Sequence, residues 1–246
     1  DSFYRGGDAD AAIALSLAEA GAGADIIDIG AESTRPGAAP VSEEEELRRL
    51  EPVVRALAAS GAVLSVDTRH AQVMAAALAW GARIINDVSA LEGDGSLDIA
   101  AKTGAPVVIM HMRGEPGTMQ HDPRYQDVVT EVRQFLEERV EACLSAGLQA
   151  ERIALDPGFG FGKTLQHNLE LLRRLGELSV RGLPIMAGLS RKSLVGTLTG
   201  RPPGERLHGS VALAVIAALN GARILRVHDV AATVDALAVV GAVRSG

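Results

Sequence analysis

Seven short apolar runs alternate along the chain with longer segments in which hydrophobic residues recur at helical spacing. The apolar runs lack polar alternation, which is typical of parallel strands that are buried on both faces. We expect strands at residues 24–29, 62–66, 82–86, 106–110, 152–155, 183–187 and 222–227. We expect helices at residues 9–20, from Ser42 onward, and at 70–79, 95–102, 127–145, 166–175, 191–198, 205–219 and 230–240.

This order of elements predicts an α/β protein with a parallel sheet, and we favour the (β/α)8 TIM barrel. A barrel needs an eighth strand. Because residues 1–7 read as a loop, we expect the first strand to lie upstream of the given chain. An open, doubly wound sheet is the alternative, but no Gly-x-Gly-x-x-Gly follows the first expected strand. No linker or repeat divides the sequence, so we expect residues 1–246 to form a single domain.

Composition narrows the classes of function. With 24 Lys and Arg against 31 Asp and Glu, the net charge is -7, which argues against a general nucleic-acid-binding protein. Phosphate binding would therefore need a local basic cluster. The one cysteine, Cys143, lies in a helical pattern and is expected to be a packed thiol. No run approaches the ~18 apolar residues of a membrane span and no signal peptide is visible, so we expect a cytoplasmic protein.

Polar and charged residues follow the expected strands at their carboxyl ends. In a parallel barrel these ends converge at one mouth, where ligands bind. The segments are Asp28-Ile-Gly-Ala-Glu32-Ser-Thr-Arg-Pro-Gly37, Ser65-Val-Asp67-Thr-Arg69, Asn86-Asp87, Met110-His111-Met112, Asp156-Pro-Gly-Phe-Gly-Phe-Gly-Lys163, Gly188-Leu-Ser-Arg-Lys-Ser193 and Arg226-Val-His228-Asp229. Their carboxylates, amide and basic cluster predict a site for an anion and a heterocycle.

The same segments, with Asp1-Ser-Phe3, Gly6-Gly7 and Thr118-Met119-Gln120, resemble in order the motifs of the dihydropteroate synthase family. The resemblance runs the length of the chain and implies a TIM barrel. It also implies the condensation of 6-hydroxymethyl-7,8-dihydropterin pyrophosphate with p-aminobenzoate, with release of pyrophosphate. Tyr4-Arg5 departs from the Ser-Asp pair that the family usually has there.

The resemblance assigns the pterin to four residues. Asp156 would accept two hydrogen bonds from the guanidine-like edge of the ring, a pairing that is strong when water is excluded. Its structural alternative is to cap the turn at Pro157-Gly158. Asn86 can both donate and accept, Lys192 can donate to a ring oxygen or nitrogen, and Asp67 can accept from another ring N–H.

The leaving pyrophosphate needs positive charge, and the resemblance places Thr34, Arg35, Arg226 and His228 around it together with Mg²⁺. Arg226 and His228 are two residues apart, so on a strand end their side chains can point the same way. A pair between His228 and Asp229 is the structural alternative. The family's metal-binding asparagine belongs to the strand expected upstream, so the metal ligands stay unknown.

A pterin methylene can carry positive charge that is delocalised into the ring nitrogens, so we expect a dissociative substitution, which the resemblance also implies. Asp67 would stabilise the cation as a nearby anion. The catalytic residues would be Asp67, Lys192, Arg226 and His228. The arylamine attacks as the neutral species, and no general base is required.

The start of the helix expected at 191–198 offers N–H groups to an anion. The resemblance places the carboxylate of p-aminobenzoate there and its ring against loop side chains. The residues of this second site would be Phe3, Thr34, Arg35, Pro36, Phe161, Lys192 and Ser193. His111 is expected to be structural or to act behind the substrate contacts, and Lys163 is given no role.

Two other functions are compatible with a pterin site. A corrinoid-linked pterin methyltransferase shares the barrel but needs no pyrophosphate cradle, so the Thr34-Arg-Pro-Gly37 and Ser190-Arg-Lys-Ser193 motifs disfavour it. A non-catalytic paralogue would only bind pterin or a partner, and the presence of Asp67, Asn86, Lys192, Arg226 and His228 disfavours it. For partners we expect small-molecule substrates, neither nucleic acid nor membrane, and a homodimer through the apolar helices Val211–Leu219 and Val234–Val240.

Overall fold

The computed structural model describes residues 8–33, 40–115 and 117–244. Each expected strand and helix is present in this part of the chain, with small shifts at the ends. The strands are β1 (Ile27–Ile29), β2 (Leu64–Asp67), β3 (Ile84–Asp87), β4 (Val107–Met110), β5 (Ile153–Asp156), β6 (Ile185–Ala187) and β7 (Ala222–Leu225). The helices are α1 (Ala9–Gly21), α2 (Glu43–Ala59), α3 (Ala71–Trp80), α4 (Ser96–Thr103), α5 (Val128–Ser145), α6 (Leu165–Arg173), α7 (Ser193–Thr199), α8 (Leu207–Leu219) and α9 (Val230–Arg244).

The strands form one parallel sheet in the order β1-β2-β3-β4-β5-β6-β7. Because each strand is followed by a helix and the strand order is sequential, the fold has the TIM-barrel arrangement. The expected fold class is therefore confirmed. Among the described residues, none of the helices has the length and hydropathy that a membrane crossing requires.

Contacts divide the chain into two compact units, one of residues 1–109 with 141–153 and one of residues 110–140 with 154–246. Each unit has its own core. In the first, the fully buried side chains include Leu50, Leu57, Leu64, Met74 and Ile85. In the second they include Leu136, Leu155, Phe159 and Leu171. The expectation of a single domain stays a prediction.

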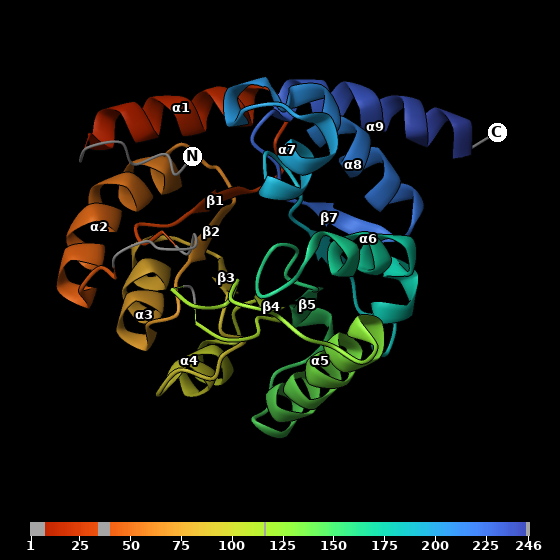
Figure 1. Ribbon diagram of the computed structural model, residues 1–246. Helices are drawn as coiled ribbons and strands as arrows, with labels where there is room; N and C mark the ends of the chain where they lie inside the picture. Colours follow the sequence, from red (N-terminus) through yellow and green to blue (C-terminus); the bar gives the residue numbers. More distant parts are fainter. Residues whose placement is uncertain (1–7, 34–39, 116, 245–246) are drawn as a thin grey trace. The chain divides into compact units, whose positions relative to one another are not determined.

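In the first unit α1, α2 and α3 follow one another on the same side of β1 and β2 (Figure 1), with contacts from α2 to both neighbouring helices. Helix α2 buries Leu50, Val54 and Leu57 at helical spacing, and Glu46 is buried as well, whereas Glu44 and Arg48 are exposed. Burying each such side chain stabilises the fold by roughly 1.5–3 kcal/mol. This packing fixes the strand ends that carry the polar residues.

Ser42 caps helix α2, whose first residue is Glu43. The Ser42 hydroxyl accepts a hydrogen bond from the Glu45 backbone N–H at 3.3 Å. The Glu45 carboxylate turns the other way and binds Arg48 and Arg49, at 2.6 Å and 2.7 Å. Two guanidinium groups one turn along the helix therefore bind the carboxylate. A capping box would need this carboxylate to accept a hydrogen bond from the Ser42 backbone N–H, so Ser42 caps the helix with its hydroxyl alone.

Strand β7 differs from the expectation that the strands are buried on both faces. Its four residues are half-buried or exposed, and β1 is also only partly buried, whereas β4 and β5 are buried throughout. Strands β1 and β7 stand at the two ends of the sheet order, where a strand has one neighbour instead of two. Strand β7 also ends at Leu225, so Arg226 and His228 lie in the loop that follows it.

Candidate functional site

Two polar residues meet at the strand ends of the first unit. The Asn86 side chain, which is 5% exposed, donates from Nδ2 to the Asp28 carboxylate at 3.0 Å. Since an ionised carboxylate only accepts, this bond fixes the orientation of the amide and directs its oxygen away from Asp28. Asp28 thus belongs to this cluster, although the sequence analysis gave it no role there.

Asp67 lies next to Asn86 in the register of β2 and β3. It packs against the backbone of β1. A Cβ added at Gly30 would come within 3.1 Å of both the Cβ and the carbonyl oxygen of Asp67. The glycine therefore leaves room for the half-buried Asp67 side chain at this strand end.

Glu32 contacts two other segments of the first unit. Its Oε1 accepts a hydrogen bond from the Val41 backbone N–H at 3.2 Å, and its Oε2 lies 3.2 Å from Nε of Arg69. The predictions for Thr34, Arg35 and Pro36, and that for Phe3, fall outside the described residues. They stay predictions.

Asp156 ends β5 in the second unit and is 5% exposed. Burial raises the pKa of its carboxyl, while the positive charges of Lys192, Arg226 and Lys163 and the Gly158 backbone N–H act to lower it. The N–H of Gly158 donates to Oδ1 at 2.7 Å. The turn-capping role is thus present, and three basic side chains act electrostatically on the same carboxylate.

The loop after Asp156 requires glycine. Gly158, Gly160 and Gly162 all have positive φ, between 60° and 83°. A Cβ on Gly158 would lie 1.9 Å from the His111 carbonyl oxygen, and one on Gly162 would lie 2.3 Å from that of Arg113. The loop therefore lies with its backbone directly on the segment that follows β4, which no side chain at these positions would permit.

Lys163, which received no role from the sequence, is buried at the end of this loop with 3% exposure. Its Nζ lies 2.9 Å from Nδ1 of His111 and 3.0 Å from the carbonyl oxygens of Gly158 and Phe161. Burial, and then the charge of Lys163, lower the pKa of His111 to about 2. His111 is therefore a neutral structural partner, as expected, and Lys163 is the residue that sequence reasoning missed.

Lys192 lies at the start of α7. Its Nζ donates to the Phe159 carbonyl oxygen at 2.5 Å and lies 4.7 Å from the centre of the half-buried Phe161 ring. Phe159, in contrast, is fully buried in the core. Ser193 is the first residue of α7 and is exposed. The ammonium of Lys192 and the ring of Phe161 thus lie together, as the resemblance implies.

His228 contacts Ser190. Its Nδ1 lies 3.1 Å from the Ser190 hydroxyl, and its backbone N–H donates to the same oxygen at 3.3 Å. Asp229 binds the Arg191 guanidinium with both oxygens, at 3.1 Å and 2.5 Å. The Arg191–Asp229 ion pair leaves His228 oriented by Ser190, another residue that was not assigned to the site.

The Mg²⁺ prediction receives no support from side-chain geometry. Within residues 8–33, 40–115 and 117–244, no group of three or more His, Cys, Asp or Glu side chains could hold a metal ion together. Mg²⁺ commonly keeps waters and binds through one or two carboxylates and substrate phosphates. The described residues therefore do not form a metal cage, and the Mg²⁺ prediction stays a prediction.

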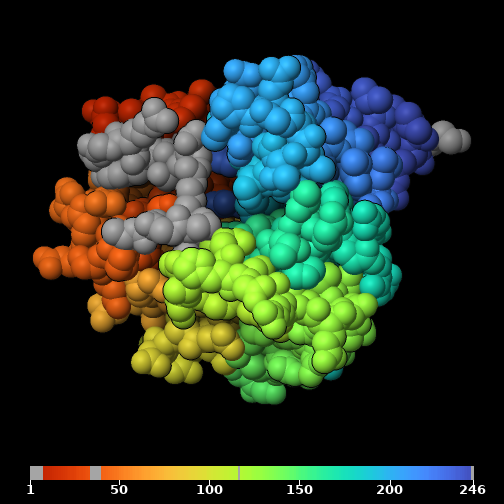
Figure 2. All heavy atoms as spheres, in the orientation of Figure 1, coloured from red at the N-terminus to blue at the C-terminus, as the bar shows by residue number. Residues whose placement is uncertain are grey.

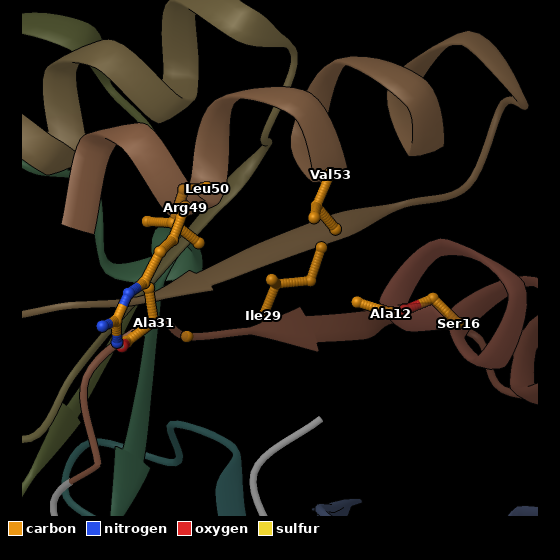
Figure 3. Close-up of a pocket in the computed structure, with 8 residues that line it drawn as sticks. Ala12, Ser16, Ile29, Ala31, Arg49, Leu50 and Val53 are labelled. Carbon is orange, nitrogen blue, oxygen red and sulfur yellow. The ribbon is translucent and has the colours of Figure 1, made fainter. Parts of the chain in front are cut away.

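A small cavity lies behind the β1 strand end, within the first unit (Figure 3). Ala12 and Ser16 of α1, Ile29 of β1 and Leu50 and Val53 of α2 line it, and the cavity measures about 20 Å³. This volume suits one water molecule. It is far too small for a pterin, so it is a packing defect and not a substrate site.

The structure therefore forms two clusters from the predicted residues. Asn86 and Asp67 are neighbours in the first unit, together with Asp28. Asp156, Lys192, Arg226 and Phe161 belong to the second unit, where Asp156 interacts with the charges of both Lys192 and Arg226. The prediction that both clusters bind one pterin stays a prediction.

Comparison with known proteins agrees with this chemistry. Residues 1–228 match the model of the family described as pterin binding enzyme. The dihydropteroate synthase of Escherichia coli strain K12 is 51% identical over 249 residues, with 100% of this chain and 88% of that protein covered.

Two solved structures have the same fold. The dihydropteroate synthase of Yersinia pestis, in a sulfonamide drug complex, matches with a TM-score of 0.96 and 51% identity, covering 100% of this chain and 91% of that one. The enzyme from Xanthomonas albilineans in complex with 7,8-dihydropteroate matches with a TM-score of 0.89 and 49% identity, covering 97% and 86%. This chain therefore belongs to the pterin binding enzyme family, among its dihydropteroate synthases.

Proposed function

We propose that this protein condenses 6-hydroxymethyl-7,8-dihydropterin pyrophosphate with p-aminobenzoate to give 7,8-dihydropteroate and pyrophosphate, a step of folate biosynthesis. The observation that carries the proposal is the full-length match, at about half identity, to dihydropteroate synthases, one of them in complex with 7,8-dihydropteroate. The enzyme is thus a transferase of a pterin-methyl group. The buried acid and the cations around it in the second unit supply the chemistry that this reaction needs.

Asp156 is the proposed anchor of the pterin. Its carboxylate is buried, and a buried carboxylate gains most from partners that donate two hydrogen bonds at once. The 2-amino group and the adjacent ring N–H of a pterin are such a pair. Lys192 would donate to a ring acceptor, and Asn86 and Asp67 would contact other polar atoms of the ring.

Arg226 and His228 are the proposed partners of the pyrophosphate, with Thr34 and Arg35. Arg226 is exposed at the surface, and Ser190 orients the ring of His228. Charge builds on the leaving oxygen as the C–O bond breaks, so cations fixed beforehand stabilise the transition state more than the substrate. We propose that Mg²⁺ enters with the pyrophosphate; activity lost with a chelator and restored by Mg²⁺ would support this, and full activity in the chelator would refute it.

The proposed reaction is dissociative. The C–O bond breaks first, pyrophosphate leaves with the electron pair, and the pterin methylene becomes a cation that Asp67 stabilises. The lone pair of the arylamine then forms the C–N bond, and the nitrogen releases a proton to solvent. Phe161, Lys192 and Ser193, with Phe3, Thr34, Arg35 and Pro36, are the proposed contacts of p-aminobenzoate.

We also propose that the protein is a homodimer. Apolar side chains are exposed on α8 and α9 (blue in Figure 2), among them Leu219 at 52%, Val239 at 65% and Val243 at 76%. Exposed apolar patches of this kind mark interaction surfaces. Light scattering at micromolar concentration should give a dimer, and Val239→Glu should shift it to a monomer while Leu15→Glu on α1 should not.

The cytoplasm is the proposed compartment, since the one cysteine, Cys143, is buried and has no second cysteine with which to form a disulfide. Activity recovered in a cytoplasmic fraction would support this, and activity confined to an envelope fraction would contradict it.

A coupled assay for pyrophosphate release tests the function. Release that depends on p-aminobenzoate, with formation of 7,8-dihydropteroate, is the expected result. Methyl transfer from a methyl-pterin without pyrophosphate release would instead indicate a pterin methyltransferase. Pterin binding without turnover would indicate a non-catalytic paralogue.

A further inference from the structure

The buried side chain of Lys163 forms hydrogen bonds to the backbone of the glycine-rich loop after β5, residues 157–163. The Nζ atom of Lys163 reaches the carbonyl oxygens of Gly158 and Phe161, both at 3.0 Å, and that of His111 at 3.3 Å. It also lies 2.9 Å from Nδ1 of His111. One atom thus ties both ends of the loop to the segment that follows β4.

Other donors hold the same loop through its carbonyl oxygens. Nζ of Lys192 donates to Phe159, and the hydroxyl of Tyr125 donates to Gly162 at 2.9 Å. These hydrogen bonds are made to backbone carbonyl oxygens and not to side chains, so they fix the path of the loop directly. The path of the loop in turn determines where the Phe161 ring lies.

A lysine suits this position better than an arginine would. The chain contains 21 arginines but three lysines, Lys102, Lys163 and Lys192, and two of the three contact this loop. An ammonium is a compact donor whose three N–H bonds can serve acceptors converging from different directions, whereas a guanidinium is planar and larger. Because the side chain is 3% exposed, there is no room for the larger group without a shift of the backbone.

Lys163 also interacts with the acid that begins the loop. Burial lowers the pKa of Lys163 well below its usual value and raises the pKa of Asp156, and the charge of each group partly offsets the effect of burial on the other. Buried charges are tolerated when they are paired and hydrogen-bonded. The carboxylate and the ammonium therefore support each other inside the second unit.

We propose that Lys163, with His111 as its partner, is a positioning residue for pterin binding: it holds the loop that places the Asp156 carboxylate and the Phe161 ring. This inference rests on the proposed function, since it takes Asp156 to be the pterin anchor. Lys163 itself touches no substrate.

Lys163→Met is the direct test, with Lys102→Met on α4 as the control because Lys102 is exposed. Calorimetry with 6-hydroxymethylpterin should show affinity weakened roughly tenfold or more in Lys163→Met, as expected for lost charge-assisted bonds, and unchanged affinity in the control. The KM for the pterin pyrophosphate should rise in parallel. A merely structural role would lower the folded fraction and the maximal rate but leave the affinity of the folded molecules unchanged, and that result would overturn the proposal.

A second pair of variants serves if Lys163→Met does not fold. His111→Asn keeps a polar atom near the position of Nδ1, whereas His111→Leu removes it. We expect weaker pterin binding in the leucine variant and near-normal binding in the asparagine variant; equal affinities in the two would overturn the proposal. Pyrophosphate release by the unmodified protein is measured separately, so a failure of the proposed function is recognised independently of these affinities.

Discussion

The polar strand ends of the two units differ in chemical character. In the first unit the cluster consists of carboxylates and an amide, Asp28, Asp67 and Asn86. In the second unit the cluster is rich in cations, among them Lys192 and Arg226. The second cluster also contains a buried acid, Asp156, so the first unit brings together acceptors and an amide, whereas the second combines an acid with basic side chains.

The two clusters are also held in place differently. The first depends on the regular register of β2 and β3 and on one side-chain hydrogen bond between Asn86 and Asp28. The second depends on an irregular loop whose glycines lie against a neighbouring backbone. Substitutions in the first cluster should therefore disrupt side-chain contacts, whereas substitutions of the loop glycines in the second should cause clashes with a neighbouring backbone.

The largest effect on stability should follow Gly158→Ala. Its Cβ would lie 1.9 Å from the His111 carbonyl oxygen at a φ of +68°, so we expect a loss of about 4 kcal/mol or more in the free energy of unfolding. Gly104→Ala, at a φ of +63° with no atom within 4 Å, should cost about 1–2 kcal/mol for the left-handed backbone alone. Urea denaturation of both variants measures the difference, and equal losses would show that the loop yields to the added atom.

The next largest effect concerns ligand affinity. Asp156→Asn replaces a charged, two-bond contact by a mismatched one, and pterin binding should weaken by about 2–3 kcal/mol. Asp67→Asn, at a more exposed position in the first unit, should weaken it by about 1 kcal/mol. Calorimetry with pterin ligands compares the two. Unchanged affinity in Asp156→Asn would show that this residue does not bind pterin. It would also contradict the expectation that the second unit contributes more to pterin affinity than the first.

Buried His111 should make the protein sensitive to acid. Burial lowers the pKa of its imidazole to about 2 from the usual 6.5. Between these pH values the unfolded chain binds a proton that the folded protein does not, so this residue's contribution to stability is present above pH 6.5 and is lost as the pH falls. The slope is about 1.4 kcal/mol per pH unit. Denaturation from pH 7 to pH 5 should show a steeper loss in the unmodified protein than in His111→Asn, and parallel curves would contradict the shift.

The smallest effect belongs to Glu46 in the first unit and has the opposite sign. Burial raises the pKa of its carboxyl above 4.5, partly offset by the hydrogen bond to His70 at 2.8 Å. Just above pH 4.5 the folded protein holds a proton that the unfolded chain has released, so stability falls as the pH rises through this window. Glu46→Gln should therefore gain stability relative to the unmodified protein as the pH rises from 4 to 6. A constant difference across this range would exclude the shift.

The sequence predicted the elements well because their hydrophobic periods are local. Strands and helices lie where the pattern places them, and the departures concern ends, such as β7, which stops at Leu225. The order of the strands followed from the alternation with helices. Burial of β7 and β1 was predicted less well because it depends on how many neighbours a strand has.

The sequence analysis identified the segments that carry the polar residues, but not the hydrogen bonds between those segments. Asp28 and Asn86 are 58 residues apart, and Lys163 and His111 are 52 apart, so their hydrogen bonds depend on tertiary structure. The lysine could have been suspected from the scarcity of lysine in the chain. The contact between His228 and Ser190, which are 38 residues apart, likewise depends on tertiary structure and was not expected from the sequence.

Because Lys163, Lys192 and Tyr125 bind the glycine-rich loop through its carbonyl oxygens, the loop positions should differ in their tolerance to mutation. Every residue offers a carbonyl, so exchanging the half-buried Phe161 for another side chain leaves the bond from Lys163 to its backbone intact. Gly158 and Gly162 have no such latitude, because any Cβ there meets a backbone atom. We expect a saturation scan of this loop to tolerate substitutions at Phe161 and to reject them at Gly158, Gly162 and the fully buried Phe159. Phe161 is then the place where a lineage could alter ligand preference while keeping the shape of the loop.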